Sequence, residues 1–154
     1  MAHAPLRDQV SAKMKEAMKS GDKVRVGALR LIMAALKDRE IEARGAGKTL
    51  GRADELALLA KMVKSRQESA AIYAAAGRRE LADQENAEIA VIDEFLPKQM
   101  DEAEVEAAAR AAIAAAGATS VKDMGKIINA LKAAHAGEMD FAKASAIVRR
   151  LLGG

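Results

Sequence analysis

The chain has 154 residues, of which 51% are hydrophobic, 31% are charged and only 2% are aromatic. Cysteine is absent, which excludes disulfides, thiol nucleophiles and zinc–thiolate sites. The net charge is +3, but residues 1–66 carry +7, residues 67–97 carry −5 and residues 98–154 carry +1. No apolar run is long enough to span a membrane, and the first residues lack a signal-peptide core. We therefore expect an ordered cytoplasmic protein with an aliphatic core.

Apolar residues at helical spacing predict four helices before Pro97 and three after it. Asp22 and Asp101 are expected to cap two of them, and Gly77 to end the third. Pro97 interrupts the pattern, because the residue before a proline avoids helical geometry. The sequence thus predicts an all-α fold, with a four-helix module over residues 1–96 and a smaller three-helix module over residues 97–154. The helices are expected over residues 6–20, 23–44, 52–76, 78–95, 102–116, 121–135 and 141–152.

Four charged residues lie where the helical period places apolar side chains. These are Arg30, Arg66, Glu85 and Glu88. Burying either sign alone costs several kcal/mol, on the order given for an isolated ion. We interpret the four as ion pairs that lock the first module, and the alternative is a polar functional groove.

Two basic patterns are candidates for phosphate contacts. Lys23, Arg30, Lys37 and Arg44 recur every seven residues along the second helix, which indicates either a phosphate-tracking surface or a solvated flank. Arg30 has a second interpretation as a core residue. At the predicted start of the sixth helix, Lys122 and Lys126 lie one turn apart, where free backbone amides suit phosphate. Gly125 between them either permits close approach of a backbone or serves helix packing.

Catalytic and metal sites are not expected from the sequence. The two histidines, His3 and His135, show no ligand spacing. The segment GAGKTLG at residues 45–51 lacks the full phosphate-loop pattern and follows a helix instead of a strand. No serine has a nearby base, and no cofactor site is expected. With so few aromatic residues, recognition of a folded RNA by shape and backbone is more plausible than base stacking.

Three segments resemble the GatB/YqeY family, and specifically its freestanding YqeY-like proteins. They are DKVRVGALRLIMAALKDREIE, KSRQESAAIYAAAGRRELADQENAEIAVIDEFLP and SVKDMGKIINALK. The family's fold is similar to the helical tail of the B subunit of the tRNA-dependent amidotransferase. That tail is linked to tRNA binding, whereas the chemistry belongs to a separate catalytic domain for which this sequence has no counterpart. A similar module is also found appended to a glutaminyl-tRNA synthetase.

The resemblance implies an accessory protein that binds tRNA or a tRNA-dependent enzyme. On this interpretation Lys122, Gly125, Lys126, Lys23, Lys37 and Arg44 contact nucleic acid. One alternative is a protein-interaction adaptor in translation. The other is a component of carbon–nitrogen ligase activity with glutamine as amido-N-donor, although we expect no independent catalysis.

Overall fold

The computed structural model describes residues 5–154, and within this range it contains seven α-helices, one short 3-10 helix and no strands. The protein is therefore all-α. The chain divides into two compact units between Leu96 and Pro97. His3 lies outside the described residues.

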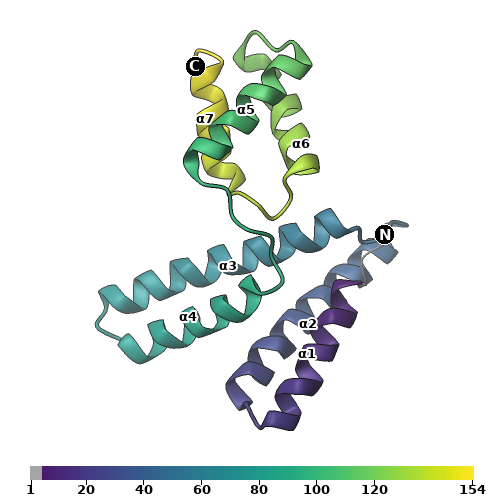
Figure 1. The fold of residues 1–154 in the computed structure, drawn as a ribbon, viewed down its shortest axis with the longest axis vertical. Coiled ribbons are helices and arrows are strands. Elements are labelled where there is room, and N and C mark those ends of the chain that lie inside the picture. The colour runs from purple at the N-terminus through teal and green to yellow at the C-terminus, as the bar shows by residue number, and fades with distance from the viewer. Residues whose placement is uncertain (1–4) are drawn as a thin grey trace. The chain divides into compact units, whose positions relative to one another are not determined.

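Two helical hairpins make up the first unit (Figure 1). Their helices are α1 (Leu6–Ser20), α2 (Lys23–Gly45), α3 (Arg52–Ala75) and α4 (Arg79–Asp93). Within unit 1, α1 packs on α2, α3 packs on α4, and α2 also contacts α4. The core forms where the hairpins meet, and its fully buried side chains are Leu6, Val10, Leu29, Ile32, Leu36, Leu59 and Ile92.

Local signals set the ends of these helices. The side chain of Asp22 accepts a hydrogen bond of 3.0 Å from the backbone N–H of Arg25, which caps the start of α2. Gly21 turns the chain between α1 and α2 with φ at 75°, a conformation that costs a residue with a Cβ more than it costs glycine. The predicted helix ends agree with the structure to within two residues in unit 1.

The α3–α4 hairpin is thinly packed away from the core. Between Leu59 and Val91 its only buried residues are Ala70 and Ala82, which are too small to bury much apolar area. An ion pair adds to this packing: Arg66 Nε lies 3.0 Å from Glu88 Oε2, and both side chains are 17% exposed. Charge attraction thus supplements a weak apolar contact in this part of unit 1.

Arg30 and Glu85, two of the four residues expected in ion pairs, form none among the described residues. The core interpretation of Arg30 is wrong, because its side chain is exposed on the solvent side of α2. Glu85 is half-buried, but it belongs to none of the ion pairs that the described residues form. The helical period alone could not show that α2 turns its Arg30 side away from the core formed with α1 and α4.

Glu55 of α3 is the buried charged residue of the described chain, with 9% of its surface exposed. Its carboxyl group lies near the backbone of Leu6, the first residue of α1. Burial raises the pKa of Glu55, and the interaction with the backbone of Leu6 opposes the rise. Glu55 therefore carries a desolvation cost at the place where the start of α1 approaches α3.

The second unit surrounds a separate aliphatic core. Its helices are α5 (Glu102–Ala116), the 3-10 helix η1 (Val121–Asp123), α6 (Met124–Ala134) and α7 (Phe141–Leu151), and the three α-helices contact one another. The buried residues are Val105, Ala109, Ile127, Leu131, Met139, Ala144 and Val148. Asp101 and Glu104 form the predicted reciprocal cap of α5. The backbone N–H of Met100 donates to the carbonyl of Glu138, 2.8 Å away. This hydrogen bond ties the segment before α5 to the α6–α7 loop.

Candidate nucleic-acid interface

The expected basic residues of unit 1 all lie on the exposed side of α2. Lys23, Lys37 and Arg44 are exposed, as is Arg30. Within residues 5–154 none of the four takes part in an ion pair. At a rise of about 1.5 Å per residue, the row from Lys23 to Arg44 is about 31 Å long. It presents uncompensated positive charge along most of α2.

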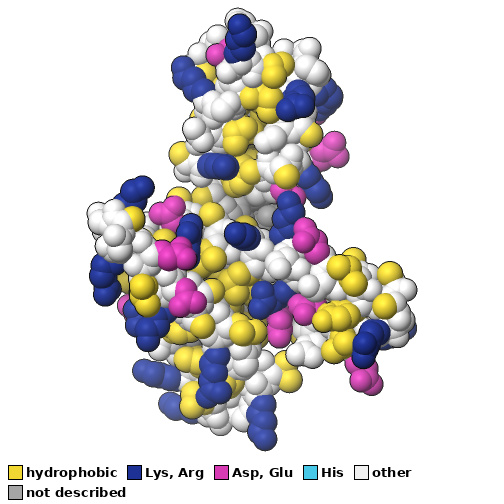
Figure 2. Space-filling view, turned by 180° about the vertical axis from the view of Figure 1, so that it is seen from behind, with side chains coloured by type: hydrophobic (Ala, Val, Ile, Leu, Met, Phe, Trp, Pro, Cys, Tyr) yellow, Lys and Arg dark blue, Asp and Glu magenta, His cyan; other side chains and the backbone are white. Residues whose placement is uncertain are grey.

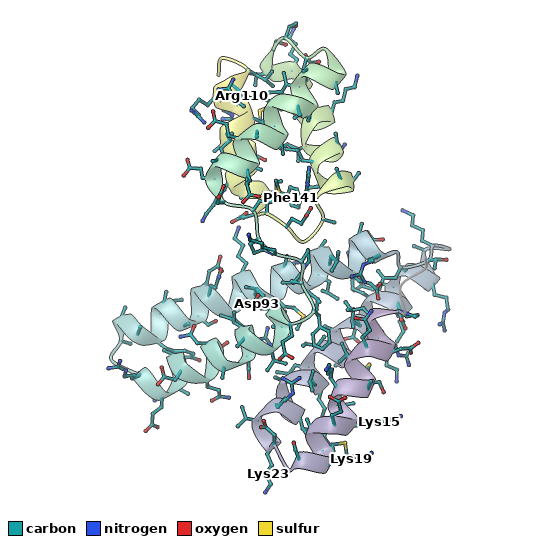
Figure 3. The ribbon with its side chains drawn as sticks, in the orientation of Figure 1. Lys15, Lys19, Lys23, Asp93, Arg110 and Phe141 are labelled. Atoms are coloured by element: carbon teal, nitrogen blue, oxygen red, sulfur yellow. The ribbon has the colours of Figure 1, made fainter. Side chains whose placement is uncertain are left out.

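Two further lysines, which were not expected from the sequence, lie beside the start of this row. Lys15 and Lys19 project from the last turns of α1, and the tight turn at Gly21 brings Lys23 near them (Figure 3). All three are exposed and lack ion-pair partners among the described residues. We call Lys15, Lys19 and Lys23 the tip lysines. The sequence does contain a signal for them. Lys15 and Lys19 are four residues apart, which places them side by side on a helix, and a glycine turn follows.

The charge at this end of unit 1 is visible on the surface. Figure 2 shows Lys and Arg side chains at the foot of the view, beside exposed apolar side chains and without acidic ones among them. Met18 and Val24, close to the tip lysines in sequence, are 57% and 65% exposed. The tip therefore offers several mobile ammonium groups that a phosphate chain can reach.

Some other cations of unit 1 are paired with carboxylates. Arg25 of α2 binds Glu94 with two hydrogen bonds, one of them 2.9 Å from Nη2 to Oε1. These hydrogen bonds hold the pKa of Glu94 below its usual value. Arg39 pairs with Glu42 on α2, at 3.0 Å. The tip lysines and the α2 row have no such partner among the described residues, and the same holds for Lys48, Lys61, Arg78 and Arg79.

The expected basic residues of unit 2 lie at the start of α6. Lys122, in η1, and Lys126, in the first turn of α6, are both exposed. Gly125 is exposed as well, and a Cβ added there would meet no atom within 4 Å. Packing within this chain therefore does not require glycine at this position. The interpretation that Gly125 serves helix packing is wrong, and its smallness leaves the backbone open to approach.

The backbone amides in front of α6 are less available than expected. The helix predicted from residue 121 begins instead as a 3-10 turn, and α6 starts at Met124. The carboxylate of Asp123 turns back and accepts from the backbone N–H groups of Thr119 and Ser120, at 3.2 and 3.4 Å. An anion here would compete with that carboxylate, so Lys122 and Lys126 are the stronger attraction for phosphate. Gly154 packs between Val121 and Arg149, which places an additional exposed arginine next to η1.

Ion pairs neutralise another part of unit 2. Glu106 of α5 lies 2.9 Å from Arg110 and 3.1 Å from Arg150 of α7. Hydrogen bonds from these two guanidinium groups lower the pKa of Glu106. His135 Nδ1 lies 3.0 Å from Glu138 Oε2, and this contact is an ion pair only when the ring is protonated.

Among residues 5–154, no three His, Cys, Asp or Glu side chains come together as a group that could hold a metal ion. None of the helices in that range has the length and apolar character needed to cross a membrane. A cleft of about 470 Å³ lies between α1 and α2, and it is lined by Pro5, Arg7, Asp8, Ser11, Met33 and Glu40.

The comparison with protein families extends over both units. The family described as Yqey-like protein matches residues 7–152. The chain belongs to the YqeY family. Because the match runs from the second residue of α1 to the end of α7, both units are part of the YqeY-like domain. No curated protein matches the chain significantly.

Proposed function

We propose that this YqeY-like protein is a cytoplasmic accessory factor that binds tRNA, or a tRNA-dependent enzyme together with its tRNA. The observation that supports the proposal is the presence, in each unit, of exposed cations without acidic partners: the tip lysines in unit 1, and Lys122 with Lys126 in unit 2. Such groups suit phosphate, which dominates the affinity of proteins for nucleic acid.

The composition indicates which features of an RNA these groups would read. The chain has one Tyr, two Phe and no Trp, so it lacks an aromatic platform for stacking bases. Lysine also contacts phosphate as a point charge and carries little sequence information. The protein would therefore recognise the shape and backbone of a folded RNA. We propose no catalytic step for the chain itself.

A titration with labelled total tRNA tests the proposal. Fluorescence anisotropy at salt concentrations from 50 to 200 mM, values chosen for the assay, gives the dependence of log Kd on log salt. We expect a steep dependence, and each lost phosphate contact should lower its slope by about 0.7 to 0.9. Lys19→Ala and Lys122→Ala should each show this loss.

Lys13→Ala is the matched control. Lys13 lies on the same helix as Lys19, but its ammonium lies 3.6 Å from the carboxylate of Glu16 and is partly neutralised. It should leave the slope nearly unchanged. The proposal is wrong if tRNA does not bind at the lowest salt concentration, or if Lys13→Ala and Lys19→Ala have the same effect.

A further inference from the structure

The solvent side of α2 carries apolar side chains that no part of unit 1 covers. Val24 is 65% exposed, Leu31 is 46% exposed and Ile41 is 57% exposed. Over the same stretch, the opposite side of α2 contributes Leu29, Ile32 and Leu36 to the core, where each is fully buried. The helix is therefore apolar on two sides, and only one of them has a partner.

The exposed side follows a regular heptad spacing. It consists of Val24, Gly27, Leu31, Ala34, Asp38 and Ile41, all exposed, and we call it the α2 seam. Successive members are three and four residues apart, which is the spacing of the a and d positions in a coiled coil. Five of the six are apolar or glycine. From Val24 to Ile41 the seam is about 26 Å long, enough for more than four helical turns.

Small residues within the seam would allow a second helix to come close. Gly27 lies in the interior of α2 with open space around it, since an added Cβ would meet no atom within 4 Å. Glycine in a helix interior destabilises the helix relative to alanine. Unit 1 obtains no packing or turn from Gly27, whereas a docked helix would gain room at Gly27 and Ala34.

A row of positive charge runs along one edge of the seam. Lys23, Arg30, Lys37 and Arg44 each lie one residue before an a position of the heptad, which is the g position. Charges at such flanking positions set which helix pairs with which, by attraction to opposite charges on the partner. We propose that the α2 seam binds an amphipathic helix of another protein, with an apolar stripe that packs on the seam and a row of Asp or Glu that meets these four cations.

Charge argues against a second copy of this chain as the occupant. In an antiparallel pair of α2 helices, the basic row would face the same row of the other copy. In a parallel pair it would face positions 28, 35 and 42, where Ala28 is buried and Glu42 is already paired with Arg39. Neither arrangement neutralises four cations.

The apolar side chains argue against RNA as the occupant of this side of α2. A phosphate backbone would satisfy the cations but would leave Val24, Leu31 and Ile41 in water. A helix with acidic and apolar residues satisfies both, because burial of large aliphatic side chains is itself stabilising. This inference goes beyond the proposed RNA binding. It shares Lys23 with the tip lysines, but its other three cations are not among them.

Synthetic helical peptides provide the probe. A labelled four-heptad peptide with Leu at a and d and Glu at e and g is titrated with the full-length protein, next to versions with Gln or Lys in place of Glu. We expect the Glu peptide to bind about tenfold or more tightly than the Gln peptide, and the Lys peptide not to bind. Leu31→Asp and Ile41→Asp should each weaken the Glu peptide about tenfold or more.

Two control variants separate the seam from general effects. Ile72→Asp changes a residue of α3 that is 67% exposed and should leave peptide affinity within about twofold of the wild type. The double variant Arg30→Glu and Lys37→Glu should bind the Glu peptide more weakly, and the Lys peptide more tightly, than the wild type does. Because all these positions are exposed, circular dichroism should show unchanged helix content.

Three results would overturn the inference. One is binding of the Glu peptide that Leu31→Asp and Ile72→Asp affect equally. Another is self-association of the wild type that Leu31→Asp abolishes, which would make a second copy the occupant. The third is a wild type that does not bind the Glu peptide, together with a loss of tRNA binding when Arg30 and Lys37 are replaced. Loss of tRNA binding in Lys19→Ala or Lys122→Ala alone concerns the proposed function and not the seam.

Discussion

The ion pair between Arg66 and Glu88 is expected to contribute measurably to the stability of unit 1. At 3.0 Å, Coulomb attraction with an effective dielectric constant of about 20 amounts to roughly 5 kcal/mol, most of which the desolvation of both groups offsets. Each side chain is only 17% exposed, so the pair lies between surface pairs, worth about 0 to 1 kcal/mol, and buried ones, whose disruption costs about 3 to 5 kcal/mol. We expect Arg66→Met or Glu88→Gln to cost about 2 kcal/mol.

A double-mutant cycle measures the coupling between the two residues. We expect a coupling energy of about 1 to 1.5 kcal/mol, because the double variant leaves no charge without a partner. Urea unfolding can be followed by the fluorescence of Tyr73, the single tyrosine of the chain, which lies on α3 and so reports on unit 1. This probe matters because two units need not unfold in one transition.

The matched control is the Arg39–Glu42 pair on α2. It has the same separation of 3.0 Å, but its side chains are 51% and 67% exposed. Its coupling energy should stay below about 0.5 kcal/mol. If the coupling energy of Arg66 and Glu88 is no larger than that of this control, then partial burial does not strengthen the pair and the reasoning fails.

Two further predictions concern single substitutions. Burial raises the pKa of Glu55, so its contribution to stability is greatest below the usual pKa of a glutamate and is lost as pH rises through the raised value. Glu55→Gln, which has no charge to desolvate, should therefore be more stable than the wild type at pH 7 and lose that advantage near pH 4. Equal pH profiles in urea titrations would contradict this. Gly125→Ala should stabilise unit 2 by about 0.5 to 1 kcal/mol, since the position is helical, exposed and open. A lower Tm of the unit 2 transition would show that the glycine has a structural role.

Much of the candidate interface was predictable from the sequence because exposure of lysines on amphipathic helices follows from the helical period. Lys23, Lys37, Lys122 and Lys126 are all exposed, as their positions indicated. The tip lysines Lys15 and Lys19 were missed because their significance depends on the turn that places them beside Lys23. The competition of Asp123 for backbone amides also escaped prediction, since it depends on the local 3-10 geometry of η1.

The sequence by itself determined the helices, because their signals are local. Asp22, Asp101 and the glycine at position 21 act on backbone groups within a few residues, so their effects do not depend on the rest of the fold. The α2 heptad is likewise visible in the printed sequence. Its two apolar sides, however, compete for the same core, and periodicity cannot show which of them is covered.

Only the tertiary structure decided how the charged residues are used. Arg30 and Arg66 look alike in the sequence, as arginines that interrupt apolar stripes, yet Arg30 is exposed and Arg66 pairs with Glu88 across α3 and α4. Glu55 lies in the first turn of α3, where the sequence singles it out in no way, but the fold buries it near the backbone of Leu6. The physical reason is the same in these cases: a helix determines which side chains share a side, whereas the energy of a charge depends on what packs against that side.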